Sequence, residues 1–255
     1  MSWIDSHCHL DFDAFNNHPQ LFQQLEEAGC LRVMVPAISL EYFQRLIEFS
    51  IQHKDKVDIA LGLHPYFIAQ HSFSDLDVLD QQLEFSRPSA VGEIGLDFML
   101  TDTDRDKQLY LFEQQVKLAI KHQLPIIVHC RKAHDQVASL VRKLSFKNGG
   151  IIHAFSGSLQ QAQNYIELGF VLGLGGALTF DRAKAMHKMV AALPDGSFVL
   201  ETDSPDMSPA FAQGEMNTPL NIPRIAQCIS SIRQQSLESI YEQTTTTYNR
   251  IVIRR

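Results

Sequence analysis

The chain has 255 residues, of which 45% are hydrophobic, and a formal net charge of -7 at pH 7. That length suffices for one large core, and we expect a single domain over residues 1–255. An acidic chain does not attract nucleic acid by its overall charge, so any phosphate binding must be local. No apolar run approaches the ~20 residues that cross a bilayer. The four cysteines form no CxxC pair and follow no signal peptide, which favours reduced thiols in a cytoplasmic protein without membrane attachment.

Short apolar runs alternate with longer amphipathic stretches along the whole chain, and each short run predicts a strand. Most of these runs are almost continuously apolar, as strands buried on both faces are. Eight strands that alternate with helices predict an α/β fold of the (β/α)8 TIM-barrel type, with a doubly wound open sheet as the alternative. The predicted strands are Trp3–Asp5, Leu31–Pro36, Val57–Leu63, Ala90–Ile94, Ile126–His129, Ile151–His153, Phe170–Gly173 and Phe198–Glu201.

The clearest predicted helix covers Asp104 to His122. Asp104 is suited to cap its N-terminus, and Pro125 ends the segment before the next strand. The glycine-rich residues 173–176 lack the GxGxxG spacing of a dinucleotide loop, so we interpret them as a tight turn after the seventh strand. The apolar face of the helix is expected at Leu109, Phe112, Val116, Ala119 and Ile120, which follow helical spacing.

Histidines and acids gather where the predicted strands end. In a parallel barrel, the carboxyl ends of all strands lie on one rim, where active sites form. Side chains alternate along an extended segment, so His7 and His9 should face one side while Cys8 points away. One such histidine is more often a core or rim residue, but this many coincidences predict a metal site. The strand ends carry His7, His9, His64, Glu93, Asp97, His129, His153, Glu201 and Asp203.

The types of ligand indicate the chemistry. Four histidines, a glutamate and an aspartate suit zinc, with magnesium or manganese as alternatives. Six ligands are too many for one tetrahedral ion, whereas two ions that share a bridging carboxylate use them all. Two divalent ions carry more charge than Glu93 and Asp203 neutralise, so the site would attract a phosphate and polarise a water toward hydroxide.

The motifs at the strand ends, taken together, resemble those of a known family. The chain resembles the TatD family of metal-dependent deoxyribonucleases, within the amidohydrolase-like TIM-barrel superfamily, and residues 204–207 are most similar to its YjjV-like bacterial subgroup. The resemblance extends from near the N-terminus to beyond residue 200. It rests on Asp5-Ser6-His7-Cys8-His9, Gly62-Leu63-His64-Pro65, Gly92-Glu93-Ile94-Gly95-Leu96-Asp97, His129, His153-Ala154-Phe155-Ser156-Gly157 and Glu201-Thr202-Asp203-Ser204-Pro205.

This resemblance implies two divalent metal ions bridged by Glu93. The other ligands would divide between the ions, with His7, His9 and Asp203 on the first and His129 and His153 on the second.

The resemblance also implies roles around the ions. Asp203 would accept a proton from the attacking water, and His64 would contact the phosphate or shuttle a proton. Arg131 would also contact the phosphate. Asp97 and Glu201 would contact the metal ligands and orient them. For Glu201, a buried carboxylate at the rim that is paired with a structural partner is an equally good interpretation.

Two segments depart from the family pattern. Cys130 stands where the family commonly has serine before the arginine, and we interpret Cys8 and Cys130 as packing residues. Residues 216–219 read Met-Asn-Thr-Pro and lack the arginine that family members usually carry there. That second departure concerns the substrate rim rather than the metal centre.

The implied reaction is hydrolysis of phosphodiesters by a metal-activated hydroxide, in the manner of a 3′-5′ exonuclease on single-stranded or frayed DNA ends. A metal-dependent amidohydrolase or esterase, acting on a substrate such as aminoacyl-tRNA, is the alternative. A non-catalytic binding protein is a third reading, but it would need neither a bridging carboxylate nor His64. The ligand set does not choose between substrates, because substrates are contacted by loops. Phe67, Phe98 and Phe155 follow strand ends and could stack on bases, although packing is their more common role.

Overall fold

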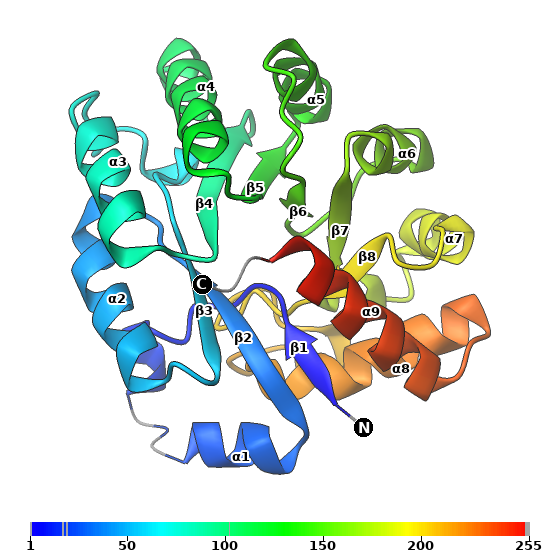
Figure 1. Cartoon of the computed structure of the whole chain (residues 1–255). Helices are drawn as coiled ribbons and strands as arrows, with labels where there is room; N and C mark the ends of the chain where they lie inside the picture. The colour runs from blue at the N-terminus through cyan, green and yellow to red at the C-terminus, as the bar shows by residue number, and fades with distance from the viewer. Residues whose placement is uncertain (1, 17, 19, 102, 253–255) are drawn as a thin grey trace.

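The computed structural model describes residues 2–16, 18, 20–101 and 103–252, and shows parallel strands surrounded by helices (Figure 1). The strands are hydrogen-bonded in sequence order from β1 to β8. Ser6 N–H donates to Leu200 O, and Asp203 N–H donates to His7 O, which brings β8 back to β1 in a nearly closed barrel. The predicted TIM barrel is confirmed, because a doubly wound sheet is not in sequence order. The strands are β1 (Trp3–Asp5), β2 (Cys30–Pro36), β3 (Val57–Leu61), β4 (Ala90–Asp97), β5 (Ile126–Arg131), β6 (Gly150–Ile152), β7 (Phe170–Leu174) and β8 (Phe198–Leu200).

The ends of these strands differ from the predicted ends by a few residues. β4 continues to Asp97 and β5 to Arg131, further than predicted, whereas His153 and Glu201 lie just beyond β6 and β8. His7 also lies beyond its strand, because the Asp5 carboxylate accepts its N–H and removes that group from the ladder. The side chains at these ends are therefore held by loops as well as by strands.

Helices lie outside the strands and follow them in alternation. In α4, Asp104 accepts the N–H of Lys107 as the predicted N-cap, and Phe112 and Val116 are buried. Ile120 is 40% exposed, so its predicted burial is wrong. A rotation of about 100° per residue places it past the buried stripe. The helices are α1 (Leu21–Glu27), α2 (Phe43–Gln52), α3 (Asp75–Ser86), α4 (Arg105–His122), α5 (His134–Lys143), α6 (Leu159–Glu167), α7 (Lys184–Ala192), α8 (Ile222–Arg233) and α9 (Leu237–Ile251), with the short 3-10 helices η1 (Asp13–Phe15), η2 (Leu40–Tyr42), η3 (Pro65–Phe67), η4 (Gly176–Thr179), η5 (Ala210–Ala212) and η6 (Pro219–Asn221).

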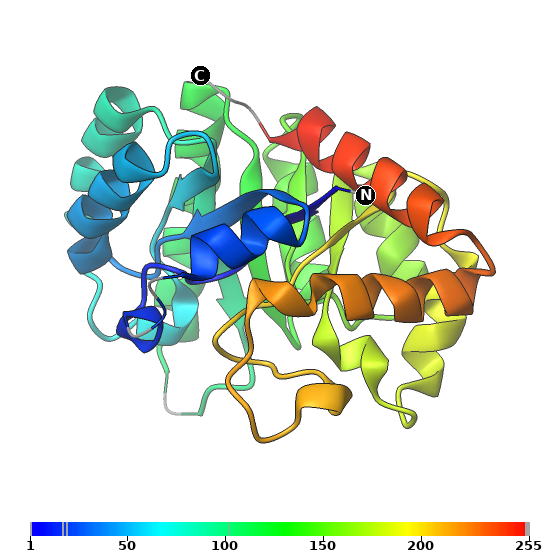
Figure 2. The same cartoon turned by 90° about the horizontal axis from the view of Figure 1, so that it is seen from below.

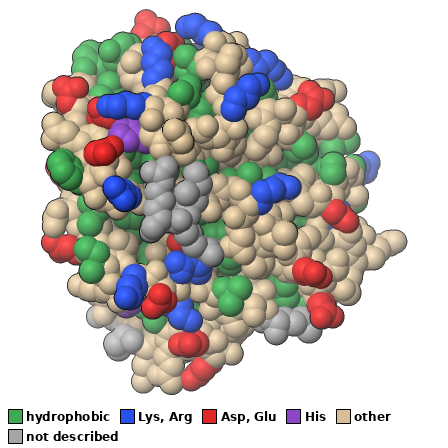
Figure 3. Space-filling view, viewed as in Figure 1, with side chains coloured by type: hydrophobic (Ala, Val, Ile, Leu, Met, Phe, Trp, Pro, Cys, Tyr) green, Lys and Arg blue, Asp and Glu red, His purple; other side chains and the backbone are tan. Residues whose placement is uncertain are grey.

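The barrel is filled from within and closed at one end. Tyr248 of α9 and Val252 pack on an inner cluster to which every strand contributes one side chain. Figure 2 shows the start of β1 and the end of α9 at one end, and the long connection from β8 to α8 at the other. Figure 3 looks onto the closed end, where basic and acidic side chains are interspersed. No described helix is long and apolar enough to cross a membrane. The inner cluster is Ile4, Met34, Ala60, Ala90, Ile127, Ile151, Val171 and Val199.

Candidate metal centre

A cavity of about 670 Å³ lies at the carboxyl ends of the strands, and we call it the metal-centre cavity. His7 lies beneath its lining, fully buried, with its ring stacked on that of His153 at 3.5 Å between centroids. The strand-end residues of the sequence therefore meet in one place. Those that line the cavity are His9, His64, Glu93, His129, His153 and Asp203.

Glu93 lies at the centre of this cluster, and its two carboxylate oxygens face different imidazoles. Its Oε2 is 3.1 Å from His7 Nε2. Its Oε1 is 3.1 Å from His64 Nε2 and 3.2 Å from His129 Nδ1. One carboxylate of β4 thus reaches groups that follow β1 and β3 and one that lies in β5.

Asp203 faces the same cluster from the loop after β8. Its Oδ1 lies 3.6 Å from His7 Nε2 and 3.7 Å from His9 Nε2, and its Oδ2 lies 3.5 Å from His153 Nε2. Ligand atoms fall within 4.8 Å of one another in three sets, so His153 groups with His7 rather than with His129. The sets are His7, His153 and Asp203; His7, His9 and Glu93; and His64, Glu93 and His129.

Two buried carboxylates face the outer nitrogens of two of these rings. Asp97 Oδ2 is 3.0 Å from His129 Nε2, which leaves the Nδ1 lone pair directed at Glu93. Glu201 Oε1 is 3.1 Å from His153 Nδ1, which leaves Nε2 directed at Asp203. Such outer partners fix the tautomer and ring orientation of metal-binding histidines.

His64 has the opposite arrangement. Its Nδ1 accepts the N–H of Tyr66 at 3.0 Å, so in the neutral ring the proton is on Nε2. That Nε2–H donates to Glu93 Oε1. An imidazole whose inward nitrogen carries a proton offers no lone pair to a metal. His64 is therefore a hydrogen-bond donor to the centre, although it lies within one of the three sets.

The ionisation of the cluster follows from burial and from the neighbouring charges. Burial opposes ionisation of Glu93, but the imidazoles of His64 and His7 hold its pKa well below the usual range. Burial likewise opposes ionisation of Asp203, but His153, His7 and His9 together lower its pKa to about 2. Burial lowers the pKa of His9 to about 4, which keeps that ring neutral. The centre thus combines anionic carboxylates with a neutral imidazole at neutral pH.

The residues fit divalent metal ions. Neither ring nitrogen of His7 has a hydrogen-bond partner among the described residues, although both are buried. An unpartnered buried polar atom is costly. A metal ion between His7 Nε2 and the facing carboxylates would satisfy it, and mixed imidazole and carboxylate ligands suit zinc and its neighbours.

Two buried glutamines of α4 position the strand ends, and the sequence analysis missed them. The Gln108 side chain accepts the N–H of Asp97 and donates to its C=O. Gln115 pairs in the same way with Leu63, directly before His64. The sequence could have indicated them, because two glutamines seven residues apart on the apolar side of a helix must find hydrogen-bond partners in the interior.

The loops of β1 and β8 are tied together by polar side chains. Asp5 accepts the N–H and the hydroxyl of Thr202. Asn217 donates to the carbonyls of Thr202 and Asp206. The segment at residues 216–219 therefore supports the loop that carries Asp203.

The rim is formed by less buried residues. The Arg131 side chain is 57% exposed, with Nη1 3.7 Å from Asp97 Oδ2. Phe155 is buried, whereas Phe67 lines the metal-centre cavity next to Tyr66, which is 60% exposed and which the sequence analysis missed.

The two cysteines next to predicted ligands differ from each other. The Cys8 thiol packs away from the cavity, against Met34 O. Cys130 is buried within the hydrophobic core, which agrees with its interpretation as a packing residue. Its thiol also lines the cavity wall, 3.2 Å from His134 Nδ1.

A parallel barrel with buried histidines and carboxylates at the carboxyl ends of its strands defines the class of metal-dependent barrel hydrolases. Within that class, the family model described as TatD related DNase matches residues 4–252, and the chain belongs to this family.

Individual relatives agree with this assignment. The chain is 38% identical over 242 residues to the uncharacterized metal-dependent hydrolase YjjV of Escherichia coli K12, covering 93% of each chain. The crystal structure of YjjV superposes with a TM-score of 0.94 at 35% identity, covering 98% of this chain and 97% of that one. The 3'-5' ssDNA/RNA exonuclease TatD of Erwinia tasmaniensis is 26% identical, over 91% of this chain and 92% of its own. The chain is thus a metal-dependent hydrolase of the TatD family.

Proposed function

We propose that this hydrolase is a deoxyribonuclease that trims single-stranded or frayed DNA ends by phosphodiester hydrolysis at a centre of two divalent ions. The observation that carries the proposal is Glu93, whose two oxygens face separate sets of imidazoles. A single-ion site has no need of such a carboxylate. The family description and the exonuclease named among the relatives support a nucleic acid as the substrate.

The proposed ligands divide into two groups, one from the ends of β1 and β8 and one from the ends of β5 and β6. His7, His9 and Asp203 would hold one ion, and His129 and His153 would hold the other, with Glu93 shared between the two sets. His153 also lies near His7 and Asp203, so it would be within reach of either ion. When bound, divalent ions activate a water and neutralise charge on phosphoryl oxygens.

Side chains of the protein then supply the proton transfer and the contacts to the phosphate. Asp203, ionised because its pKa is about 2, accepts a proton from the attacking water. His64 donates its Nε2–H toward a phosphate oxygen. Arg131, exposed at the rim, contacts the same phosphate. Asp97 and Glu201 keep the rings of His129 and His153 in place.

The decisive experiment compares a closed circular single strand with the same strand linearised, using protein reconstituted with zinc, magnesium or manganese. We expect the linear strand to be shortened from its end and the circle to persist. Equal cutting of the circle would refute end recognition. Cleavage of an aminoacyl ester, with neither DNA form cut, would assign the centre to ester hydrolysis instead.

A further inference from the structure

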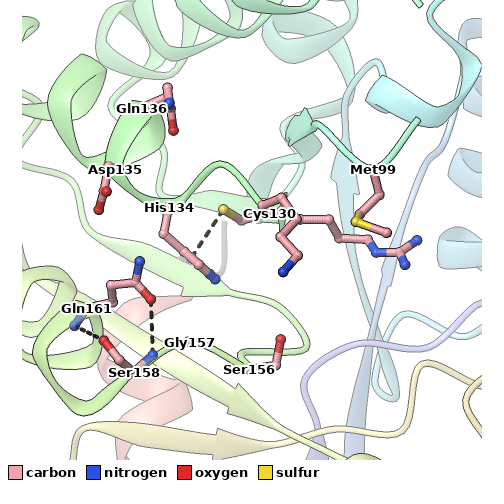
Figure 4. Close-up of a pocket in the computed structure, with 11 residues that line it drawn as sticks. Met99, Cys130, His134, Asp135, Gln136, Ser156, Gly157, Ser158 and Gln161 are labelled. Atoms are coloured by element: carbon pink, nitrogen blue, oxygen red, sulfur yellow. Dashed lines mark hydrogen bonds between the residues drawn. The ribbon is translucent and has the colours of Figure 1, made fainter. Parts of the chain in front are cut away.

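A second cavity of about 600 Å³ borders the metal-centre cavity, and we call it the side cavity (Figure 4). Cys130, Arg131 and Ser156 line both cavities, so the two share a wall. The end of β5, the first turn of α5 and the segment leading into α6 form the side cavity. Apart from Arg131, the proposed catalytic scheme uses none of its lining residues.

The side cavity has an unpaired cation. Lys132 follows Arg131 at its wall, is exposed, and has no acidic partner within ion-pair distance among the described residues. The cavity's own acid is Asp135, whose side chain lies beyond His134, away from Cys130 and Ser156 (Figure 4). Because Asp97 lies 3.7 Å from Arg131 and Asp135 points away, Lys132 supplies the uncompensated positive charge of the side cavity in an otherwise acidic protein.

In the described part of the chain, the β8 side of the metal-centre cavity has one carboxylate that is not among the proposed metal ligands, that of Asp206. Asp203 and Asp206 line it from the loop after β8, with the exposed Met207 beside them. Arg131 is the single Lys or Arg among the described residues that line this cavity. Phosphates that continue beyond the metal centre would be repelled on the β8 side and attracted on the β5 side.

The backbone adds to the field of these cations. The α5 helix begins at His134 with no side-chain cap, whereas Ser158 and Gln161 form a capping box on α6. The free N–H groups of an uncapped helix start favour an anion. This contribution reinforces the two cations and would not make a site without them.

We propose that the side cavity binds the phosphate next to the one at the metal centre, so that a single-stranded oligonucleotide leaves the centre over β5 and α5. This inference rests on the proposed nuclease function and adds to it a direction for the strand and a minimum substrate with two phosphates. Lys132 is the residue that selects for that second phosphate, while Arg131 lies in the wall that the two cavities share.

The kinetic test compares a substrate with one phosphate, the dinucleotide dTpdT, with the two-phosphate dTpdTpdT. In the metal-loaded wild type we expect kcat/KM to be about fivefold higher for the longer substrate, as one semi-exposed charge contact allows. Lys132→Gln should bring that ratio close to one, and Lys132→Arg should retain it. Lys147→Gln is the matched control, because it removes an exposed lysine before β6 at the other end of the barrel.

A binding test separates this inference from the nuclease proposal. Calorimetry on the metal-loaded protein compares thymidine 3′,5′-bisphosphate with thymidine 5′-monophosphate. A preference for the bisphosphate that disappears in Lys132→Gln supports the side cavity even if no DNA is cut, which would refute only the nuclease. DNA cleavage with no Lys132-dependent preference in either test refutes the side cavity alone. Absence of cleavage and of preference refutes both.

Discussion

Gly173 in β7 permits a sharp test of how the metal centre is supported, because its missing side chain makes room for Glu201. A Cβ atom at position 173 would stand 1.9 Å from Glu201 Oε2 and 2.5 Å from its Cδ. Real Cβ contacts essentially never fall under 3.0 Å. Gly173→Ala must therefore displace the carboxylate by about 1.1 Å or more, since the interior is close-packed.

Such a displacement removes contacts that a buried group cannot replace with water. Glu201 is 1% exposed, accepts the N–H of Ala154 at 2.6 Å and lies 3.1 Å from His153 Nδ1. Overpacking of this kind costs about 1–3 kcal/mol of folding free energy. Loss of the outer partner of His153 should lower metal affinity about 10- to 100-fold.

The assay is a double-mutant cycle on Gly173→Ala, Glu201→Ala and the double variant. Denaturant unfolding gives the free energies, and metal titration gives the affinities. In the Glu201→Ala background the added methyl meets no carboxylate, so a coupling of about 1–3 kcal/mol should appear. The reasoning is refuted if Gly173→Ala costs the same free energy in both backgrounds, or if a crystal structure of Gly173→Ala shows Glu201 unmoved.

Three further predictions concern the charge and orientation of site groups. Glu93→Gln keeps the shape but removes the charge between the imidazole sets, so hydrolysis should fall by orders of magnitude in a folded protein; wild-type activity with unchanged metal content would contradict the two-ion scheme. Asp97→Asn loosens His129 and should weaken metal binding about tenfold in competition with a chelator, against unchanged circular dichroism. Burial lowers the pKa of His71, whose Nε2 lies 2.9 Å from His64 O, so the unfolded chain binds a proton that the folded chain does not. The contribution of neutral His71 to the free energy of unfolding is therefore fully present above pH ~6.5 and is lost as the pH falls. His71→Gln should flatten the decline in melting temperature between pH 7 and pH 5, and a decline equal to that of the wild type would contradict this reasoning.

The sequence by itself determined the barrel and the residues that gather on its rim. Continuous apolar runs indicate strands buried on both faces, and parallel strands present all their carboxyl ends on one side. A histidine or acid at such an end, like His129 or Asp203, is therefore placed by local pattern alone. The place of Asp97 and Glu201 behind the ligands came from the family resemblance, because a position at a strand end does not distinguish a ligand from the partner of a ligand.

The tertiary structure decided what depends on contacts between distant segments. The proton on His64 follows from its contact with a backbone N–H, and Gln108 and Gln115 find their partners only once α4 packs on the sheet. The sequence marks Gly173 as part of a turn, whereas packing shows it as the space that Glu201 occupies. The side cavity beside Lys132 likewise exists only where the end of β5, the first turn of α5 and the segment before α6 come together. Periodicity along a chain encodes which face a residue takes, but register and packing between elements fix which groups meet.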